Sequence, residues 1–116
     1  MPDFILISYY FSKEIGNGKH IIIWTLKEEY SEQEKADIKR GIKEGLEGLK
    51  DKVPGIVEIK VYIDGLASSN ADLMLDSTFT DEEALKGYAV HPEHVAVANG
   101  KVRPFTKTRS CFDFEV

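Results

Sequence analysis

The sequence predicts an α+β fold in which a four-stranded antiparallel sheet carries its helices on one face, in the chain order βαββαβ. Two observations support this prediction. Four segments rich in β-branched and aromatic residues are interleaved with two segments whose apolar residues recur at helical spacing. Each helical segment also begins with a capping signal. A chain of 116 residues has room for one such domain and little else.

The first half of the domain is predicted as a strand, a helix and a second strand. The first strand runs from His20 to Leu26, and the capping box Ser31-Glu32-Gln33-Glu34 opens the helix. Gly45 lies on the apolar stripe of that helix, where it is expected to allow a close approach to the sheet. Val53-Pro54-Gly55 turns the chain. The second strand, from Ile56 to Ile63, is expected to direct four residues to one face: Val57, Ile59, Val61 and Ile63.

The second half repeats the pattern with one addition. A third strand is predicted from Asp72 to Thr80, and Thr80-Asp81-Glu82-Glu83 is interpreted as a second capping box. His91-Pro92 interrupts the helix, and Pro92 can open a further short helix as its first residue. The last strand is expected to place residues on two faces, Phe112, Phe114 and Val116 on one and Cys111, Asp113 and Glu115 on the other.

Residues 1–18 are interpreted as an N-terminal extension, and residues 19–116 as the domain. The apolar run Phe4–Ile7 is too short to span a bilayer and lacks the basic residues that begin a signal peptide. It could add an edge strand or an oligomer contact. Gly16-Asn17-Gly18 marks the boundary.

The βαββαβ order is the ferredoxin-like arrangement, which leaves one sheet face bare. In the first strand, Ile21 and Ile23 alternate with Ile22, Trp24 and Leu26, so either choice of faces exposes an apolar strip. Such strips are rare on monomers. The pattern therefore predicts a homodimer through the sheet faces, with Trp24 as a candidate interface position.

Composition excludes several partners. The net charge of −5, without a dense basic stripe, argues against nucleic acid and against anionic membrane surfaces. A single cysteine, Cys111, suits a reducing compartment and predicts a cytoplasmic protein. Cys111 itself is interpreted as a small buried residue.

Five segments together resemble the Dabb family, the stress-responsive dimeric α/β-barrel domain. They are His20-Ile21-Ile22-Ile23-Trp24-Thr25-Leu26-Lys27, Val53-Pro54-Gly55-Ile56, Phe79-Thr80-Asp81-Glu82-Glu83-Ala84-Leu85, Tyr88-Ala89-Val90-His91-Pro92-Glu93-His94-Val95 and Cys111-Phe112-Asp113-Phe114. The resemblance implies a homodimer with a barrel-like space between its two sheets and no obligatory cofactor.

The same resemblance implies candidate site residues. Plant polyketide cyclases of the family use a tyrosine and a histidine that match Tyr88 and His94 as general acid and base, and a histidine that matches His20. A further pocket histidine of those enzymes is replaced here by Leu73. A histidine titrates near neutral pH and a tyrosine can donate to a developing enolate, so Tyr88 and His94 are candidate catalytic residues. His20, His91 and Trp24 are candidate ligand-binding residues.

Two functions stay open at this point. One is a stress-associated dimer that binds a small apolar or enolisable molecule without catalysis, and the other is a cofactor-independent cyclase or isomerase. His20, His91 and His94 could share a metal ion, but the sequence places no cysteine or carboxylate as a further ligand, so no metal site is predicted. The basic cluster is either solvated surface or a carboxylate-binding mouth: Lys101, Arg103, Lys107 and Arg109.

Overall fold

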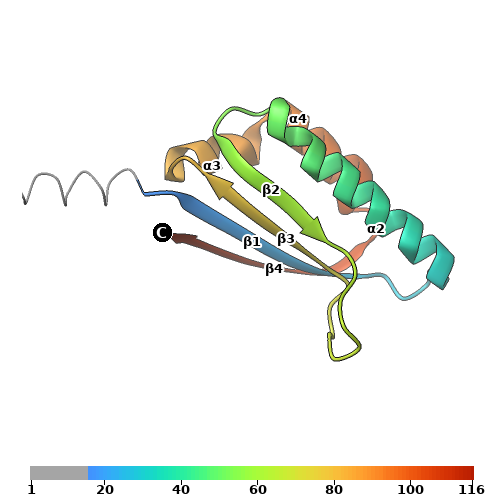
Figure 1. Ribbon diagram of the computed structural model, residues 1–116. Coiled ribbons are helices and arrows are strands. Elements are labelled where there is room, and N and C mark those ends of the chain that lie inside the picture. The colour runs from blue at the N-terminus through green and yellow to red at the C-terminus, as the bar shows by residue number, and fades with distance from the viewer. Residues whose placement is uncertain (1–15) are drawn as a thin grey trace, which may run out of the picture.

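The computed structural model describes residues 16–116 (Figure 1). Its elements follow the predicted order, including the short helix predicted before the last strand. They are β1 (Gly18–Leu26), α2 (Glu32–Glu47), β2 (Ile56–Tyr62), β3 (Leu73–Phe79), α3 (Glu82–Val90), α4 (Pro92–Val97) and β4 (Thr106–Glu115). A 3-10 turn, Gly48–Asp51, extends α2, and a π-helical turn, Ala98–Val102, extends α4.

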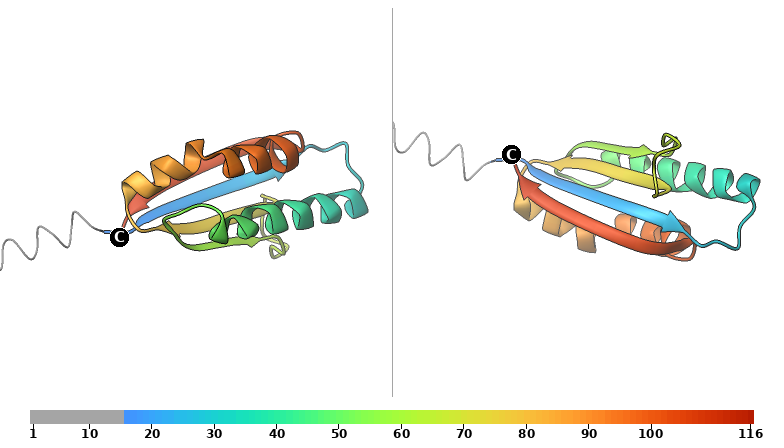
Figure 2. Two further views of the ribbon diagram at one scale, coloured as in Figure 1. Left: turned by 90° about the horizontal axis from the view of Figure 1, so that it is seen from above. Right: turned by 90° about the horizontal axis from the view of Figure 1, so that it is seen from below.

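The four strands form one antiparallel sheet in the order β2-β3-β1-β4. The helices all lie on one face, α2 over the β2/β3 side and α3 and α4 over the β1/β4 side, and the opposite face is bare (Figure 2). This arrangement confirms the ferredoxin-like α+β prediction. None of the helices within residues 16–116 has both the length and the apolarity needed to cross a membrane.

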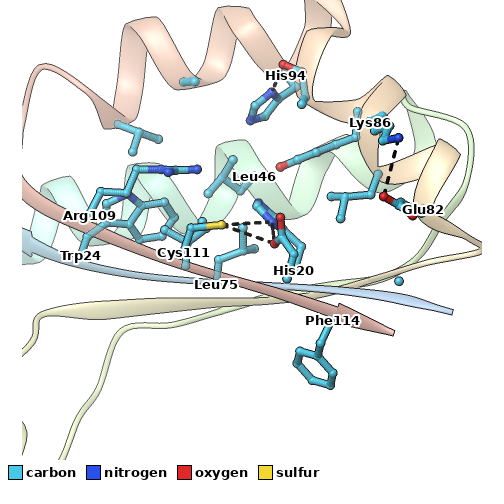
Figure 3. A pocket seen from close by; sticks show the side chains of 18 of the residues that line it. His20, Trp24, Leu46, Leu75, Glu82, Lys86, His94, Arg109, Cys111 and Phe114 are labelled. Carbon is cyan, nitrogen blue, oxygen red and sulfur yellow. Dashed lines mark hydrogen bonds and ion pairs between the residues drawn. The ribbon is translucent and has the colours of Figure 1, made fainter. Parts of the chain in front are cut away.

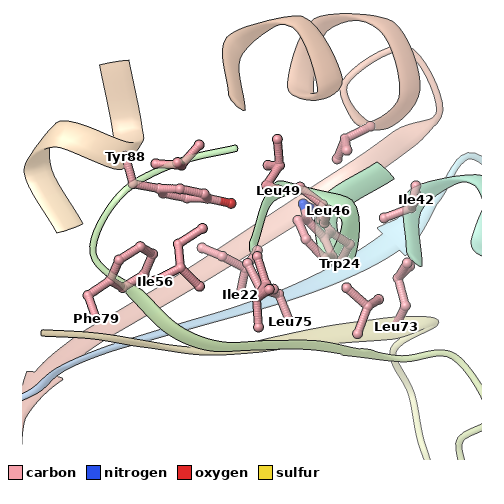
Figure 4. Packing of buried hydrophobic residues seen from close by; sticks show 14 of the residues in the cluster. Ile22, Trp24, Ile42, Leu46, Leu49, Ile56, Leu73, Leu75, Phe79 and Tyr88 are labelled. Carbon is pink, nitrogen blue, oxygen red and sulfur yellow. The ribbon is translucent and has the colours of Figure 1, made fainter. Parts of the chain in front are cut away.

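The hydrophobic core lies on the inner face of the sheet, which is the face that the helices cover (Figure 4). In β1, the alternate residues His20, Ile22 and Trp24 point to this face. Trp24 is only 5% exposed. Its interpretation as a dimer-interface position is therefore wrong, because its indole packs inside a single protomer. The core comprises Ile22, Trp24, Leu26, Ile42, Leu46, Leu49, Val53, Ile56, Ile59, Val61, Leu73, Leu75, Phe79, Tyr88 and Val102.

The opposite, outer face carries an apolar patch on β1 and β4. Ile21 faces Phe112 in the register of the two strands. Ile23, Phe112 and Phe114 are 40%, 69% and 40% exposed. We call Ile21, Ile23, Phe112 and Phe114 the outer patch. The bare apolar face predicted from the strand pattern is present, and it is formed by the outer patch instead of Trp24.

Strand β2 departs from the predicted alternation at its beginning. Val57 is exposed, whereas Ile56 is buried. The register against β3 shifts between Ile56 and Glu58, which is the signature of a β-bulge. The extra residue restarts the alternation, so that Ile59 and Val61 point inward as predicted and Val57 does not.

The helix caps confirm one predicted box and correct the other. Ser31 Oγ accepts from the Glu34 N–H, and Glu34 accepts from the Ser31 N–H. At α3, however, the cap is Asp81 and not Thr80, because the Asp81 carboxylate accepts from the Ala84 N–H at 2.8 Å. Pro92 is the first residue of α4, as predicted.

Two glycines are required by close contacts. A Cβ at Gly45 would lie 3.0 Å from Val97 Cγ1 and 3.1 Å from Lys101 Cδ, so Gly45 allows α2 to approach α4, and not the sheet as expected. Gly55 has a φ of +90° and a Cβ there would lie 2.6 Å from Ala84 Cβ. The turn before β2 therefore depends on glycine.

The predicted N-terminal extension falls mostly outside the described residues, and the run Phe4–Ile7 lies wholly outside them. Strand β1 begins at Gly18, and the Val116 N–H donates to the Asn17 carbonyl at 2.9 Å. The division at residue 18 stays a prediction.

Candidate functional site

A cavity of about 550 Å³ lies between the inner face of the sheet and the helices α3 and α4 (Figure 3). Arg109, Cys111 and Asp113 of β4 line the cavity and are nevertheless exposed, so the cavity is open to solvent along this edge strand. It lies within one protomer, on the helix-covered side, and is distinct from the barrel-like space between two sheets that the resemblance implies. Much of its wall is apolar: Ile22, Trp24, Leu46, Leu75, Leu85, Ala98 and Val102.

Tyr88 and His94 meet in this cavity. Tyr88 comes from α3 and His94 from α4, and their ring centroids are 4.1 Å apart. In one continuous helix, residues six positions apart would point in directions about 120° apart around the axis. The break at Pro92 removes that constraint, because α4 begins a new direction. The His-Pro step is therefore what brings the two rings together.

Burial affects these two side chains in opposite ways. The Tyr88 hydroxyl is fully buried and has no hydrogen-bond partner within residues 16–116. Burial raises the pKa of Tyr88 far above its usual value of 10.0, so the phenol keeps its proton. Burial also lowers the pKa of His94 from 6.5, and the charges of His20, Arg103 and Arg109 act in the same direction, against a hydrogen bond to the Ala89 carbonyl. The His94 imidazole is therefore neutral at pH 7.

A second group of polar side chains lies across the cavity on β1 and β4. His20 Nδ1 is 2.5 Å from Asp113 Oδ1, and Cys111 Sγ is 3.4 Å from the same oxygen. Because a carboxylate only accepts, His20 carries its proton on Nδ1. Its ring stands edge-on to Tyr88, with the centroids 6.1 Å apart. Cys111 is exposed, so its interpretation as a small buried residue is wrong; partial desolvation and the neighbouring Asp113 raise the pKa of its thiol.

The predicted site residues separate into two sets. Tyr88, His94, His20 and Trp24 all line the cavity. His91 does not: its Nδ1 accepts from the Glu93 N–H at 3.1 Å and caps α4. The three histidines thus do not form one cluster.

A different group has the composition of a metal site. Ligand atoms of His20, Cys111 and Asp113 lie within 4.8 Å of one another, so these residues could supply three ligands to a divalent cation. The expectation that no cysteine or carboxylate accompanies the histidines is wrong for His20. In the structure its nitrogen is already satisfied by Asp113.

Comparison with protein families identifies the domain. Residues 19–116 match the model of the stress-responsive A/B barrel domain, Dabb. The chain belongs to the Dabb family.

Solved structures related to this Dabb domain share its fold. A dimeric protein of unknown function from Bacteroides fragilis is 31% identical, with 87% of this chain and 97% of that chain covered and a TM-score of 0.81. A Dabb family protein from Mesorhizobium loti is 21% identical over 85% and 95%, with a TM-score of 0.60. A hydroxynitrile lyase from Passiflora edulis is 15% identical over 88% and 94%, with a TM-score of 0.67. No match was found among functionally curated proteins.

The polar β4 residues of this Dabb domain include two that sequence reasoning did not place in the site, Cys111 and Asp113, and one, Arg109, that it named as part of a possible carboxylate-binding mouth. Arg109, Cys111 and Asp113 alternate with outward-facing residues and share the inner face with β1. The alternation was visible in the sequence, but the pairing of Asp113 with His20 was not, because it joins residues 93 apart. Leu73, which replaces a histidine of the cyclases, packs in the core and does not line the cavity.

Proposed function

We propose that this Dabb domain forms a homodimer that binds an apolar, enolisable small molecule in each cavity and moves a proton on it without a cofactor. The observation that carries the proposal is the Tyr88 hydroxyl, a buried donor without a partner beside the neutral ring of His94. A buried hydroxyl left unpaired costs about 1–3 kcal/mol. A ligand carbonyl that displaces the side chains now covering the hydroxyl would supply the missing acceptor.

The hydrogen bonds assign the roles. A carbonyl oxygen only accepts, so His94 Nδ1 donates its proton to the Ala89 carbonyl at 3.2 Å, and Nε2 keeps a free lone pair. His94 Nε2 is then the general base, and the Tyr88 O–H is the donor. Groups whose environments separate their pKa values in this way suit acid–base catalysis.

The proposed reaction is a proton transfer next to a ketone. His94 Nε2 takes a proton from the carbon beside the carbonyl, and the electron pair of that C–H bond becomes the C=C bond of an enolate. The Tyr88 O–H donates to the oxygen that gains the negative charge. In a β,γ-unsaturated ketone the enolate extends to the γ carbon, and return of the proton there isomerises the molecule. Attack of the enolate carbon on a second carbonyl instead closes a ring, and the protonated His94 returns its proton to the resulting alkoxide.

The dimer is proposed to form through the outer patch. A continuous apolar surface of this kind is uncommon on monomers, and the Bacteroides fragilis relative is described as dimeric. We also infer a cytoplasmic location, which the unpaired thiol of Cys111 supports.

Proton exchange tests the catalytic part. Phenylacetone in D₂O exchanges its benzylic hydrogens for deuterium, which proton NMR follows directly. The wild-type protein should accelerate the exchange, and His94→Ala should remove a factor of about 100 or more, as loss of a general base does. Tyr88→Phe should slow the exchange while the protein stays folded.

His91→Asn is the matched control, because His91 lies outside the cavity and asparagine also caps helices. It should exchange like the wild type. Binding of phenylacetone without exchange would reduce the function to that of a ligand-binding dimer. Exchange that survives in His94→Ala would contradict the assigned base.

A further inference from the structure

The cavity has a cationic end that the proposed proton transfer does not use. Arg103 and Arg109 both line the cavity and are exposed at its opening. Within residues 16–116, neither guanidinium forms an ion pair with a carboxylate. The Arg103 guanidinium donates to the side-chain oxygen of Asn99, which carries no charge. Two cations therefore face one cavity without an anion between them.

Of the other charged side chains that line the cavity, Glu115 lies six residues beyond Arg109 on β4, which separates their backbones by about 20 Å, and the rest are paired. Lys86 and Glu82 lie 3.6 Å apart, and Asp113 is hydrogen-bonded to His20. Arg109 and Asp113 are four residues apart on β4, so their backbones are separated by about 14 Å at the usual rise of a strand. The acid therefore does not neutralise Arg109.

The remaining basic residues of the cluster do not share this position. Lys107 binds Glu28 at 2.7 Å, and neither Lys101 nor Lys107 lines the cavity. Arg109 is the register partner of Trp24, and its side chain extends over the cavity beside the indole (Figure 3). The cationic end thus adjoins the indole of Trp24.

We propose that Arg103 and Arg109 bind the carboxylate of the ligand, so that the molecule taken by this cavity is an apolar keto acid. The proposal builds on the proposed function by naming the substrate class. A guanidinium presents parallel N–H donors that match the two oxygens of a carboxylate. The apolar chain of the acid would lie against Trp24 and Leu46, which leaves its ketone to accept from Tyr88.

Octanoate and 1-octanol test this inference without any turnover. The two probes share an apolar chain and differ in the carboxylate. Trp24 is the only tryptophan of the chain and lines the cavity, so its fluorescence reports occupancy. The wild-type protein should bind octanoate at least about tenfold more tightly than octanol, since hydrogen bonds to charged groups are the stronger ones.

Substitution assigns the effect to the two arginines. In Arg109→Gln and in Arg103→Gln the octanoate affinity should fall about three- to tenfold each, while the octanol affinity stays unchanged. Arg40→Gln is the matched control, because Arg40 lies on α2, pairs with Asp37 and does not line the cavity. Two independent variants keep the test valid if one of them folds poorly.

The outcomes separate this inference from the proposed function. Equal affinities for octanoate and octanol, or an octanoate affinity that neither arginine variant changes, would overturn the cationic end while leaving the acid–base site intact. Arginine-dependent octanoate binding by a protein that exchanges no phenylacetone hydrogens would support the cationic end and contradict the catalysis. Binding of neither octanoate nor octanol would overturn the cationic end, and the exchange of phenylacetone hydrogens would still decide the proposed function.

Discussion

At the scale of single residues, the Tyr88 hydroxyl combines a cost to stability with a use in binding. The hydroxyl is buried without a hydrogen-bond partner in the described part of the chain. The phenol ring that carries it packs against Phe79, with 4.9 Å between the ring centroids. Tyr88→Phe keeps the ring and removes the unpaired group. We expect this variant to gain about 1 kcal/mol in the free energy of unfolding while losing catalysis. Urea unfolding followed by circular dichroism measures the gain, and a clear loss of stability would show that the hydroxyl has a partner.

His94 predicts a pH dependence of stability. Its pKa is lowered from 6.5 in the folded protein, chiefly by burial, so the unfolded chain binds this proton more readily. The contribution of His94 is therefore fully present above pH 6.5 and is lost as the pH falls through the lowered value. When the pH is lowered from 7.5 to 5, the free energy of unfolding of the wild type should therefore fall more than that of His94→Gln. Parallel stability curves for the two proteins would contradict the shift.

At the scale of elements, the start of α3 is determined by Asp81. Its carboxylate accepts from the Ala84 N–H, whereas the neighbouring Thr80 makes no such bond. Asp81→Ala should lower the free energy of unfolding by about 1 kcal/mol, the usual effect of removing a cap. Thr80→Ala is the comparison, with a smaller effect expected in the same thermal melts. A larger loss from Thr80→Ala would restore the capping box read from the sequence.

The elements themselves were predictable because their signals are local. The capping box at Ser31 and the proline that opens α4 each act within four residues, and both were placed correctly. The face of β2 was predicted only in part, since the bulge at Val57 depends on pairing with β3 and leaves no mark in composition. Local alternation likewise could not say which side of β1 the helices cover. Trp24 consequently had two equivalent assignments until the helices were in place.

At the scale of the whole molecule, the outer patch predicts how the dimer comes apart. Ile23 is 40% exposed on the bare sheet face. Ile23→Asp would place a carboxylate in the proposed interface. Burial of an unpaired charge is unfavourable, so the variant should weaken the association of the subunits. We expect a folded monomer by sedimentation equilibrium at micromolar concentration. Leu66→Asp, at an 80% exposed position away from the sheet, should remain dimeric. A wild-type protein that is already monomeric would contradict the proposed dimer.

The candidate site was predictable to the extent that it follows from one sequence segment. Tyr88 and His94 belong to the same Tyr-x-x-His-Pro-x-His stretch, and the resemblance to the Dabb family pointed to both. Asp113 and Arg109 enter the cavity only because β4 pairs with β1, a contact between the two ends of the domain. His91 belongs to the same segment as His94, yet it is used as a cap, since the direction of a side chain depends on where the helix restarts.

Alternate residues of β1 and β4 serve two surfaces at once. His20, Arg109 and Asp113 face the cavity, while Ile21, Ile23 and Phe112 between them form the outer patch. Ligand binding in the cavity and dimer formation through the outer patch are therefore two equilibria that involve the same two strands. If a ligand tightens the pairing of β4 with β1, the subunits must associate more strongly, and association must strengthen ligand binding by the same factor. Strand β4 is an edge strand and is exposed on the side of the helices, so it is the element that would couple ligand binding to dimer formation.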